Sequence, residues 1–206
     1  MGCRIYLVRH GETLWNHAMR YQGHADIPLN EKGYTQARAV ARRLSSERID
    51  AVYSSDLQRA RVTAEAIAAV HGLPVQIDRS LREINFGAWE GLTRDEIRLR
   101  FPEVSREWWS NPVGTRLPGG ETLAEVADRA VSYLLGTARR HPGGTVVVAS
   151  HGGTIRAVIG RLIRMDLNEY WRLRQDNAAL NLLEVQDGDR AVLLLFNDTS
   201  HLLAST

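Results

Sequence analysis

Short apolar runs alternate with segments of helical periodicity along the 206 residues of this chain. An uninterrupted run of Val-Val-Val-Ala at residues 146–149, close after two glycines, is typical of a central, buried strand. The shorter run at residues 75–77 predicts an edge strand, and Asp-Gly-Asp at residues 187–189 predicts the turn between the last two strands. In total, the apolar runs predict strands at residues 5–9, 51–53, 75–77, 146–149, 180–185 and 191–196.

Helical periodicity predicts helices at residues 30–44, 56–70, 93–110, 122–139 and 154–163. We expect Asn30 and Asp56 to cap the first two helices, Gly72 to end the second and Pro102 to interrupt the third. The alternation predicts an α/β fold, a three-layer sandwich with a mostly parallel central sheet flanked by helices, in a single domain over residues 1–206. Residues 84–120 carry little strand signal and predict a helical excursion over one edge of the sheet.

Composition excludes several classes of partner. The chain is 44% apolar and 24% charged, which is ordinary for a globular protein, and its net charge of +2 does not favour nucleic acid or an acidic membrane surface. The single cysteine, Cys3, allows neither an internal disulfide nor a cysteine metal cluster. We see no signal peptide and no apolar run long enough to cross a membrane. We therefore expect a cytoplasmic protein, and the sequence leaves a homodimer open.

Two predicted strands end in the same way. Val-Arg-His-Gly at residues 8–11 and Ala-Ser-His-Gly at residues 149–152 each deliver a histidine to the end of a strand. The carboxyl ends of parallel strands meet at one edge, so His10 and His151 are expected to lie together beside Arg9. A single histidine of this kind is usually an ordinary loop residue, but the repeated context favours a function. An arginine next to a histidine indicates chemistry on an anion, most simply a phosphate.

Two further charged residues follow strands. Arg59 is expected in the first turn of a helix and Glu83 in a loop, and each alone would be an ordinary surface charge. However, the segments that contain these two residues and the histidine motifs follow one another in a characteristic order over nearly the whole chain. This set resembles the histidine phosphatase superfamily, in the branch that includes cofactor-dependent phosphoglycerate mutases and related phosphatases. The matching segments lie within residues 7–16, 21–33, 54–64, 83–91, 119–121 and 150–152.

The resemblance implies a role for each motif residue. His10 would be the nucleophile that forms a phosphohistidine, for which it must be neutral, and nearby arginines disfavour its protonation. Arg9, Arg59 and His151 would surround the phosphoryl group and stabilise its spreading negative charge. Because arginines take the part that magnesium plays elsewhere, neither a metal nor a cofactor is implied. The remaining residues implied to bind substrate are Asn16, Gln22, Gly23 and Gly152.

Glu83 is the implied proton donor to the leaving oxygen, after which its carboxylate would activate water. Glu12 is the rival because it lies close to His10 in the sequence. On the family pattern Glu12 is less favoured, and it is equally explained as an acidic residue at a helix N-terminus.

The acceptor of the phosphoryl group follows from what comes after Glu83. Family mutases carry a longer chain and a basic insertion there, whereas residues 84–91 contain no basic residue. This favours water, and hence a phosphatase that hydrolyses a small phosphate ester, with phosphoglycerate mutase as the alternative. A non-catalytic member that binds a phosphorylated ligand is disfavoured because the set of catalytic residues is complete.

The chain most resembles small bacterial phosphatases of the α-ribazole, phosphoserine and broad-specificity types. Phe86, next to the acid, suggests an apolar or aromatic leaving group such as that of α-ribazole 5′-phosphate. For Trp108 and Trp109, helix packing is at least as good an explanation as substrate contact. Other candidates for the walls of the pocket are His24, Arg116 and residues 197–201.

Overall fold

The computed structural model describes residues 2–186 and 190–203, so the predicted turn at residues 187–189 lies outside the described residues. Within them, six strands form one sheet in the order β3-β2-β4-β1-β5-β6. The first four in this order are parallel, while β5 and β6 run antiparallel at one side. The mostly parallel sheet and the edge position of β3 are therefore confirmed. The strands are β1 (Cys3–Arg9), β2 (Ala51–Ser54), β3 (Val75–Ile77), β4 (Thr145–Ser150), β5 (Leu180–Val185) and β6 (Ala191–Asp198).

The helices are α1 (Leu14–His17), α2 (Glu31–Leu44), α3 (Gln58–His71), α4 (Arg94–Arg100), α5 (Pro102–Ser110), α6 (Leu123–Arg140), α7 (Gly152–Leu162) and α8 (Ser200–Leu203). Short 3-10 helices are η1 (Arg79–Leu81), η2 (Gly87–Trp89) and η3 (Leu167–Arg172). Between residues 2 and 186 and between 190 and 203, none of the helices has the length and apolar character needed to cross a membrane.

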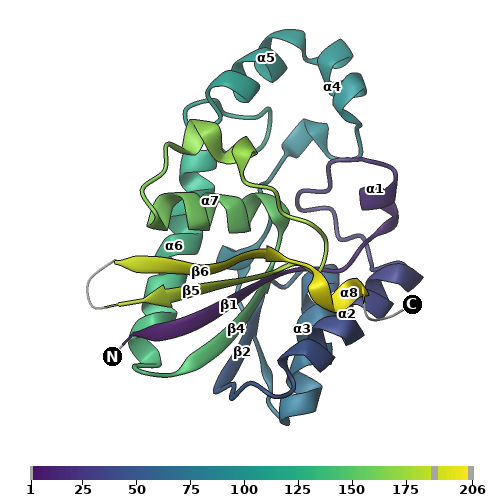
Figure 1. Ribbon diagram of the computed structural model, residues 1–206. Coiled ribbons are helices and arrows are strands. Elements are labelled where there is room, and N and C mark those ends of the chain that lie inside the picture. Colours follow the sequence, from purple (N-terminus) through teal and green to yellow (C-terminus); the bar gives the residue numbers. More distant parts are fainter. Residues whose placement is uncertain (1, 187–189, 204–206) are drawn as a thin grey trace.

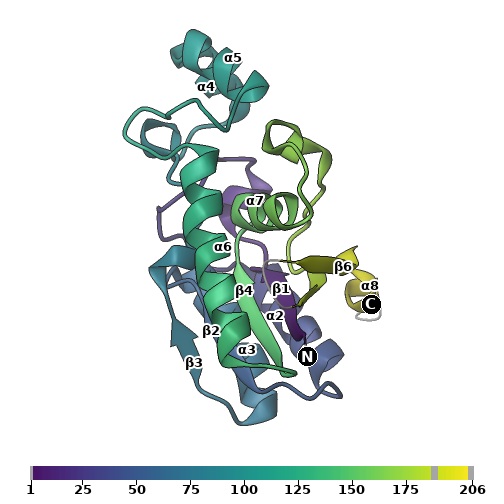
Figure 2. The ribbon, with the colours of Figure 1, turned by 90° about the vertical axis from the view of Figure 1, so that its left-hand side faces the viewer.

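The two faces of the sheet explain the three layers. Successive residues of a strand point to opposite faces. Accordingly, Ile5 and Leu7 of β1 pack in one apolar cluster with α6 and α7, while Tyr6 and Val8 pack in another with α2 and α3. Figures 1 and 2 show these helix pairs on opposite sides of the strands. The predicted three-layer arrangement is confirmed.

The predicted excursion is also present. Residues 84–120 contain α4 and α5, which lie away from the sheet (Figure 1). This segment has an apolar core of its own, in which the buried rings of Trp89 and Trp108 meet edge to face with centroids 6.2 Å apart. The same cluster includes Phe86 and Tyr170, so the excursion is packed against the chain that follows α7.

Most predicted helix boundaries are confirmed. The Asn30 side chain caps α2 by accepting a hydrogen bond from the backbone N–H of Gly33 at 2.8 Å. Gly72 ends α3 in the left-handed conformation at φ +64°, where glycine is favoured. Pro102 separates α4 from α5 and begins the second of them.

Two predictions about helix starts are wrong. Asp56 does not cap α3; its carboxylate accepts hydrogen bonds from Arg82 at 2.7 and 2.6 Å. The first turn of α3 is instead bound by Asp26, whose carboxylate accepts from the backbone N–H of Gln58 at 2.7 Å. Helix α7 begins at Gly152, two residues before the predicted start at Thr154. Glycine has low helix propensity, and that preference is outweighed here by close packing, described below.

Candidate active site

His10 and His151 lie together at the end of two neighbouring parallel strands. In the register of β1 and β4, Arg9 is the partner of Ser150, so the histidines follow at equivalent positions. Their ring centroids are 5.2 Å apart, and both residues are buried. The predicted meeting of the two histidine motifs at one edge of the sheet is therefore confirmed.

A hydrogen bond determines which nitrogen of His10 can act as a nucleophile. Nδ1 lies 2.7 Å from the carbonyl oxygen of Gly11. A carbonyl can only accept, so Nδ1 carries the hydrogen and Nε2 carries the lone pair. Burial lowers the pKa of His10 well below 6.5, and the charges of Arg59 and Arg9 lower it further. His10 is thus neutral, and burial contributes more to this than the arginines that the sequence indicated.

Arg9 and Arg59 are held by backbone carbonyls. The Nη1 of Arg9 donates to the carbonyl of Gln175 at 2.6 Å, while the Nη groups of Arg59 donate to the carbonyls of Ala25 and Gly23, both at 2.7 Å. Burial lowers the pKa of each guanidinium to about 10, so both stay charged at neutral pH. The buried Nε of each has no hydrogen-bond partner among the described residues. The buried Arg59 and the partly buried Arg9, each with an unused Nε donor, form a site suited to an anion.

His151 offers a further unused group. Both of its ring nitrogens are buried without a hydrogen-bond partner in the described part of the chain. Burial, followed by the charge of Arg59, lowers its pKa well below 6.5. His151 is therefore neutral, with one N–H that can donate to an oxygen of the same anion.

The Glu83 carboxylate lies at the N-terminus of α7. It accepts hydrogen bonds from the backbone N–H groups of Gly153 and Thr154, both at 3.1 Å. A Cβ at Gly153 would lie 2.5 Å from Oε1 of Glu83 and 2.7 Å from Cδ1 of Ile84, so a larger residue would displace the carboxylate or Ile84. This close approach accounts for the second of the two glycines that begin α7.

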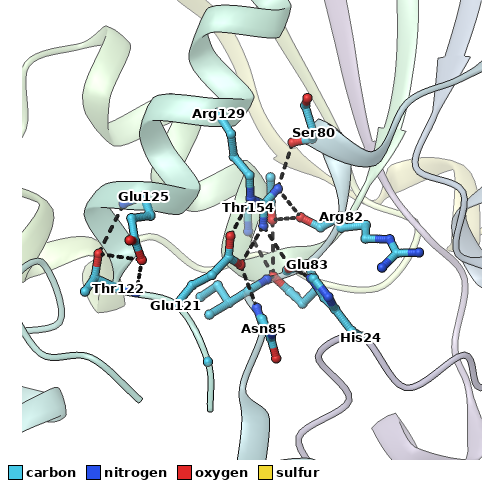
Figure 3. A network of polar contacts seen from close by, with 12 residues as sticks. His24, Ser80, Arg82, Glu83, Asn85, Glu121, Thr122, Glu125, Arg129 and Thr154 are labelled. Atoms are coloured by element: carbon cyan, nitrogen blue, oxygen red, sulfur yellow. Dashed lines mark hydrogen bonds and ion pairs between the residues drawn. The ribbon is translucent and has the colours of Figure 1, made fainter. Parts of the chain in front are cut away.

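The loop that carries Glu83 is fastened to α6 by Arg129 (Figure 3). Its guanidinium donates to the carbonyls of Ser80, Arg82 and Glu83 at 2.7, 2.8 and 2.9 Å. It also forms an ion pair with Glu121, at 2.9 and 3.0 Å. Because one side chain binds several backbone positions around Glu83, it restricts where the carboxylate can lie.

A cavity of about 200 Å³ opens beside these residues. Six of the nine predicted site residues line it: Arg9, His10, Asn16, Gln22, Arg59 and Glu83. Phe86, the predicted leaving-group contact, also lines it. His151, Gly23 and Gly152 are not among the lining residues. The remaining lining residues are Met19, Arg20, Tyr21, Gly153, Arg156, Tyr170 and Trp171.

Asn16 and Gln22 present amide donors to the cavity. The Oδ1 of Asn16 accepts from the backbone N–H of Thr13 and from Nδ2 of Asn177, both at 3.1 Å. The Oε1 of Gln22 accepts from the Thr13 hydroxyl at 3.0 Å. With the oxygens bound in this way, the N–H groups of both amides are the atoms left to bind a ligand.

Gly23 and Gly152 affect the positions of Arg59 and Arg9. Gly23 has φ +54°, and a Cβ there would lie 2.1 Å from Oε1 of Glu90. Its carbonyl is one of the two that hold Arg59. A Cβ at Gly152 would lie 3.2 Å from Nε of Arg9, so glycine gives that side chain room. Direct contact of either glycine with substrate stays a prediction.

Several other candidates lie outside the cavity lining. Trp108 packs against Trp89, and Trp109 lies under the guanidinium groups of Arg94 and Arg98, which favours the packing explanation. Arg116 pairs with Glu125 at the surface. Residues 197–201 do not border the cavity.

Two further candidates have other partners. The Glu12 carboxylate is bound by Lys32 at 2.7 Å and by Asn30 at 3.0 Å, away from the cavity. His24 approaches the site only through the backbone, with Nε2 3.0 Å from the carbonyl of Glu83.

The cavity residues of α7 and η3, and also Met19, Arg20 and Tyr21, were not predicted from the sequence. Arg156 lies one helical turn beyond Gly152, so the helical spacing could have indicated that it lies on the same face as the predicted site residue. Tyr170 and Trp171 come from a 3-10 segment with no motif to mark them. Within the described residues, no group of three or more His, Cys, Asp or Glu side chains is arranged to hold a metal ion.

Comparison with known proteins identifies the family. The model of the histidine phosphatase superfamily (branch 1) matches residues 5–199. The chain belongs to this superfamily. It is 38% identical over 199 residues to phosphoserine phosphatase 1 of Hydrogenobacter thermophilus, covering 97% of this chain and 94% of that protein. It is 41% identical over 201 residues to phosphoglycerate mutase-like protein 4 of Arabidopsis thaliana, covering 96% and 86%.

A solved structure confirms the fold assignment. Phosphoserine phosphatase of Entamoeba histolytica, in complex with 3-phosphoglyceric acid, superimposes with a TM-score of 0.89 at 32% identity, covering 97% of this chain and 99% of that one. The superfamily and these relatives confirm the predicted enzyme class, which is phosphatase.

Proposed function

We propose that this histidine phosphatase is a metal-independent phosphomonoesterase that hydrolyses small phosphorylated metabolites through a phosphohistidine on His10. The observation that carries the proposal is the hydrogen bond from Nδ1 of His10 to Gly11, which leaves the lone pair on Nε2. The cavity beside it is lined by Arg9 and Arg59, which suit a phosphoryl group.

In the first step, Nε2 of His10 attacks phosphorus while the bond from phosphorus to the ester oxygen breaks. Glu83 gives a proton to the leaving oxygen, so the product is an alcohol rather than an alkoxide. Arg9 and Arg59 stabilise the negative charge that spreads over the phosphoryl oxygens, and the N–H of His151 adds a donor.

In the second step, water attacks the phosphohistidine. The Glu83 carboxylate, ionised by the first step, accepts the proton of the water as the new bond to phosphorus forms. The bond from phosphorus to Nε2 breaks, which releases inorganic phosphate and restores neutral His10 and protonated Glu83.

The cavity supports a small substrate with an apolar part. Its volume of about 200 Å³ leaves room for a small leaving group. Its walls include Tyr21 and Phe86, which meet edge to face at 4.8 Å between centroids, together with Tyr170 and Trp171. These rings favour a leaving group with a flat or apolar portion, and α-ribazole 5′-phosphate is one candidate.

Phosphoglycerate mutase is a second candidate function because of two unexpected cations. A mutase needs positive charge for a second phosphate, and residues 84–91 supply none. Arg20 and Arg156, however, line the cavity from other segments. A 2,3-bisphosphoglycerate-dependent assay with 3-phosphoglycerate tests this candidate: formation of 2-phosphoglycerate faster than release of phosphate would favour it.

The test of the main proposal is hydrolysis of p-nitrophenyl phosphate with EDTA present. We expect turnover in the wild type, none above background in His10→Ala, and full activity in the matched control His17→Ala, whose side chain is exposed. Rapid acid-free quenching and mass spectrometry are expected to find the phosphate on His10. Equal activity in His10→Ala would overturn the proposed intermediate, and a requirement for added metal would overturn the metal-independent reaction.

A further inference from the structure

Arg59 is a buried cation that no carboxylate contacts directly. Its side chain lies in the first turn of α3 and is fully buried. Within the described ranges its guanidinium forms no ion pair and donates only to the backbone carbonyls of Gly23 and Ala25, both at 2.7 Å. A buried charge without a partner is strongly destabilising, so these two carbonyls, and the groups that bind them in turn, must stabilise Arg59.

The carboxylate of Glu90 lies behind these carbonyls. Its two oxygens accept hydrogen bonds from the backbone N–H groups of His24 at 2.7 Å and Ala25 at 3.0 Å. The N–H of His24 and the carbonyl of Gly23 belong to the same peptide group. One end of that group therefore donates to Glu90 while its other end accepts from Arg59. Hydrogen bonds that share a peptide group polarise each other, so the negative charge of Glu90 makes the Gly23 carbonyl a better acceptor for the guanidinium.

This indirect pairing leaves Arg59 able to bind an anion. A direct carboxylate partner takes two donors on one edge of a guanidinium, as Glu121 does on Arg129 at 2.9 and 3.0 Å. Arg59 has five N–H donors, and the two carbonyls take only two of them. Its Nε has no partner in the part of the chain that the structure describes. Glu90 thus stabilises the charge of Arg59 without occupying the donors that a phosphoryl group needs.

The electrostatics around Arg59 favour Glu90 over the other carboxylates. Burial lowers the pKa of Arg59 to about 10, and the charges of three carboxylates raise it, first Glu83, then Asp26 and Glu90. Glu83 is protonated when it acts as the acid, so its charge does not stabilise Arg59 in that step. Asp26 is exposed, and water and salt screen its charge, whereas Glu90 is half-buried.

We propose that Glu90 is a positioning residue, which holds residues 23–25 so that Arg59 presents its free N–H donors to the transferred phosphoryl group. The inference rests on the proposed function. Glu90 is not among the residues that line the cavity, so it acts through Arg59 and not by contact with the substrate.

The experiment uses three variants. Glu90→Gln removes the charge at nearly constant shape, and Glu90→Asp keeps the charge on a shorter side chain. The matched control is Glu125→Gln: Glu125 also accepts from a backbone N–H, that of Thr122 at 3.0 Å, but it is exposed and does not line the cavity. We measure kcat/KM for p-nitrophenyl phosphate and for glycerol 3-phosphate, and the dissociation constant of orthovanadate by calorimetry. Urea unfolding shows that each variant is folded.

The expected signature is a loss that does not depend on the leaving group. Every substrate shares the phosphoryl group that Arg59 binds, so Glu90→Gln should lower kcat/KM for both substrates by the same factor, about tenfold to a hundredfold. Orthovanadate adopts the five-coordinate geometry of phosphoryl transfer, so its dissociation constant should rise by a similar factor. Glu90→Asp should restore part of both losses, and Glu125→Gln should behave as wild type.

A double-mutant cycle tests whether Glu90 acts through Arg59. If it does, adding Glu90→Gln to Arg59→Met should change kcat/KM for p-nitrophenyl phosphate by less than about twofold. Three results would overturn the inference: the full loss repeated in Arg59→Met, a loss confined to glycerol 3-phosphate, or unchanged values in Glu90→Gln. Failure of the proposed function is a separate result, because it appears as p-nitrophenyl phosphate hydrolysis that does not depend on His10.

Discussion

Replacing Arg129 by methionine tests whether the position of the acid depends on the α6 side chain that holds its loop. Met keeps much of the apolar stem of Arg129 but removes all five of its hydrogen bonds, three to carbonyls and two to Glu121. Glu121 would keep its hydrogen bond from the backbone N–H of Asn85 at 2.8 Å, so it would lose its ion pair but not every partner.

The expected loss of stability follows from the burial of the ion pair. The Arg129 and Glu121 side chains are only 21% and 20% exposed, so solvent replaces the lost contacts poorly. Removing one partner of a well-buried pair costs about 3–5 kcal/mol, and the partial exposure here favours the lower end, about 3 kcal/mol. Urea unfolding measures this loss.

The expected loss of activity depends on the leaving group. With its loop released, the Glu83 carboxylate is misplaced, and a misplacement on the order of 1 Å costs about a hundredfold in rate. We expect kcat/KM for an alkyl phosphate, which reports the step that releases the leaving group, to fall by about tenfold to a hundredfold. p-Nitrophenolate leaves without help from an acid, so kcat/KM for p-nitrophenyl phosphate should fall much less.

The matched variants separate positioning from general damage. Glu83→Gln should reproduce the same dependence on the leaving group, Arg129→Lys should restore part of the alkyl phosphate activity, and Arg139→Met, on the same helix, should behave as wild type. Equal losses of kcat/KM for both leaving groups in Arg129→Met, or an unchanged kcat/KM in a folded variant, would show that Arg129 does not position the acid.

Two other predictions concern the same site. A Gly153→Ala substitution places a Cβ 2.5 Å from the Glu83 carboxylate, so we expect a loss of about 1–3 kcal/mol in urea unfolding and at least a tenfold lower kcat for alkyl phosphates; wild-type values would contradict this packing. The pKa values of His10 and His151 are held well below 6.5 by burial and by arginine charge, so below pH 6.5 the unfolded chain binds protons that the folded chain does not. The free energy of unfolding should therefore fall with falling pH by up to about 1.4 kcal/mol per unit for each group, and less steeply in His10→Asn; parallel curves would show that His10 does not contribute.

The parts that the sequence predicted well depend on contacts that are near in the chain or imposed by the sheet. The apolar run at residues 5–9 indicated β1, and two parallel strands that both end in histidine indicated that His10 and His151 share one edge of the sheet. Asn30 caps its own helix within three residues, so a local pattern was sufficient.

The parts that could not be predicted depend on side chains that cross long stretches of chain. Asp26 accepts a hydrogen bond from the first turn of α3, 32 residues away in the sequence. Asp56, the local candidate for the cap, instead accepts a hydrogen bond from Arg82. Arg129 meets the carbonyl of Glu83 across 46 residues, although its own segment reads as an ordinary amphipathic helix. Neither residue type nor periodicity distinguishes such an arginine from the exposed Arg139 on the same helix.

Contacts between distant segments also affect the choice between a phosphatase, which transfers the phosphoryl group to water, and a mutase, which must bind a second phosphate. The prediction of water as the acceptor depended on the lack of basic residues after Glu83, where family mutases carry their insertion. In the folded chain, Arg156 reaches the cavity from the helix that follows His151, and its charge has no carboxylate partner in the described residues. A short, non-basic segment after Glu83 therefore does not mean a cavity without further cations. Arg156 is on α7, whose N-terminus also binds the Glu83 carboxylate, so one helix places both charged groups at the cavity.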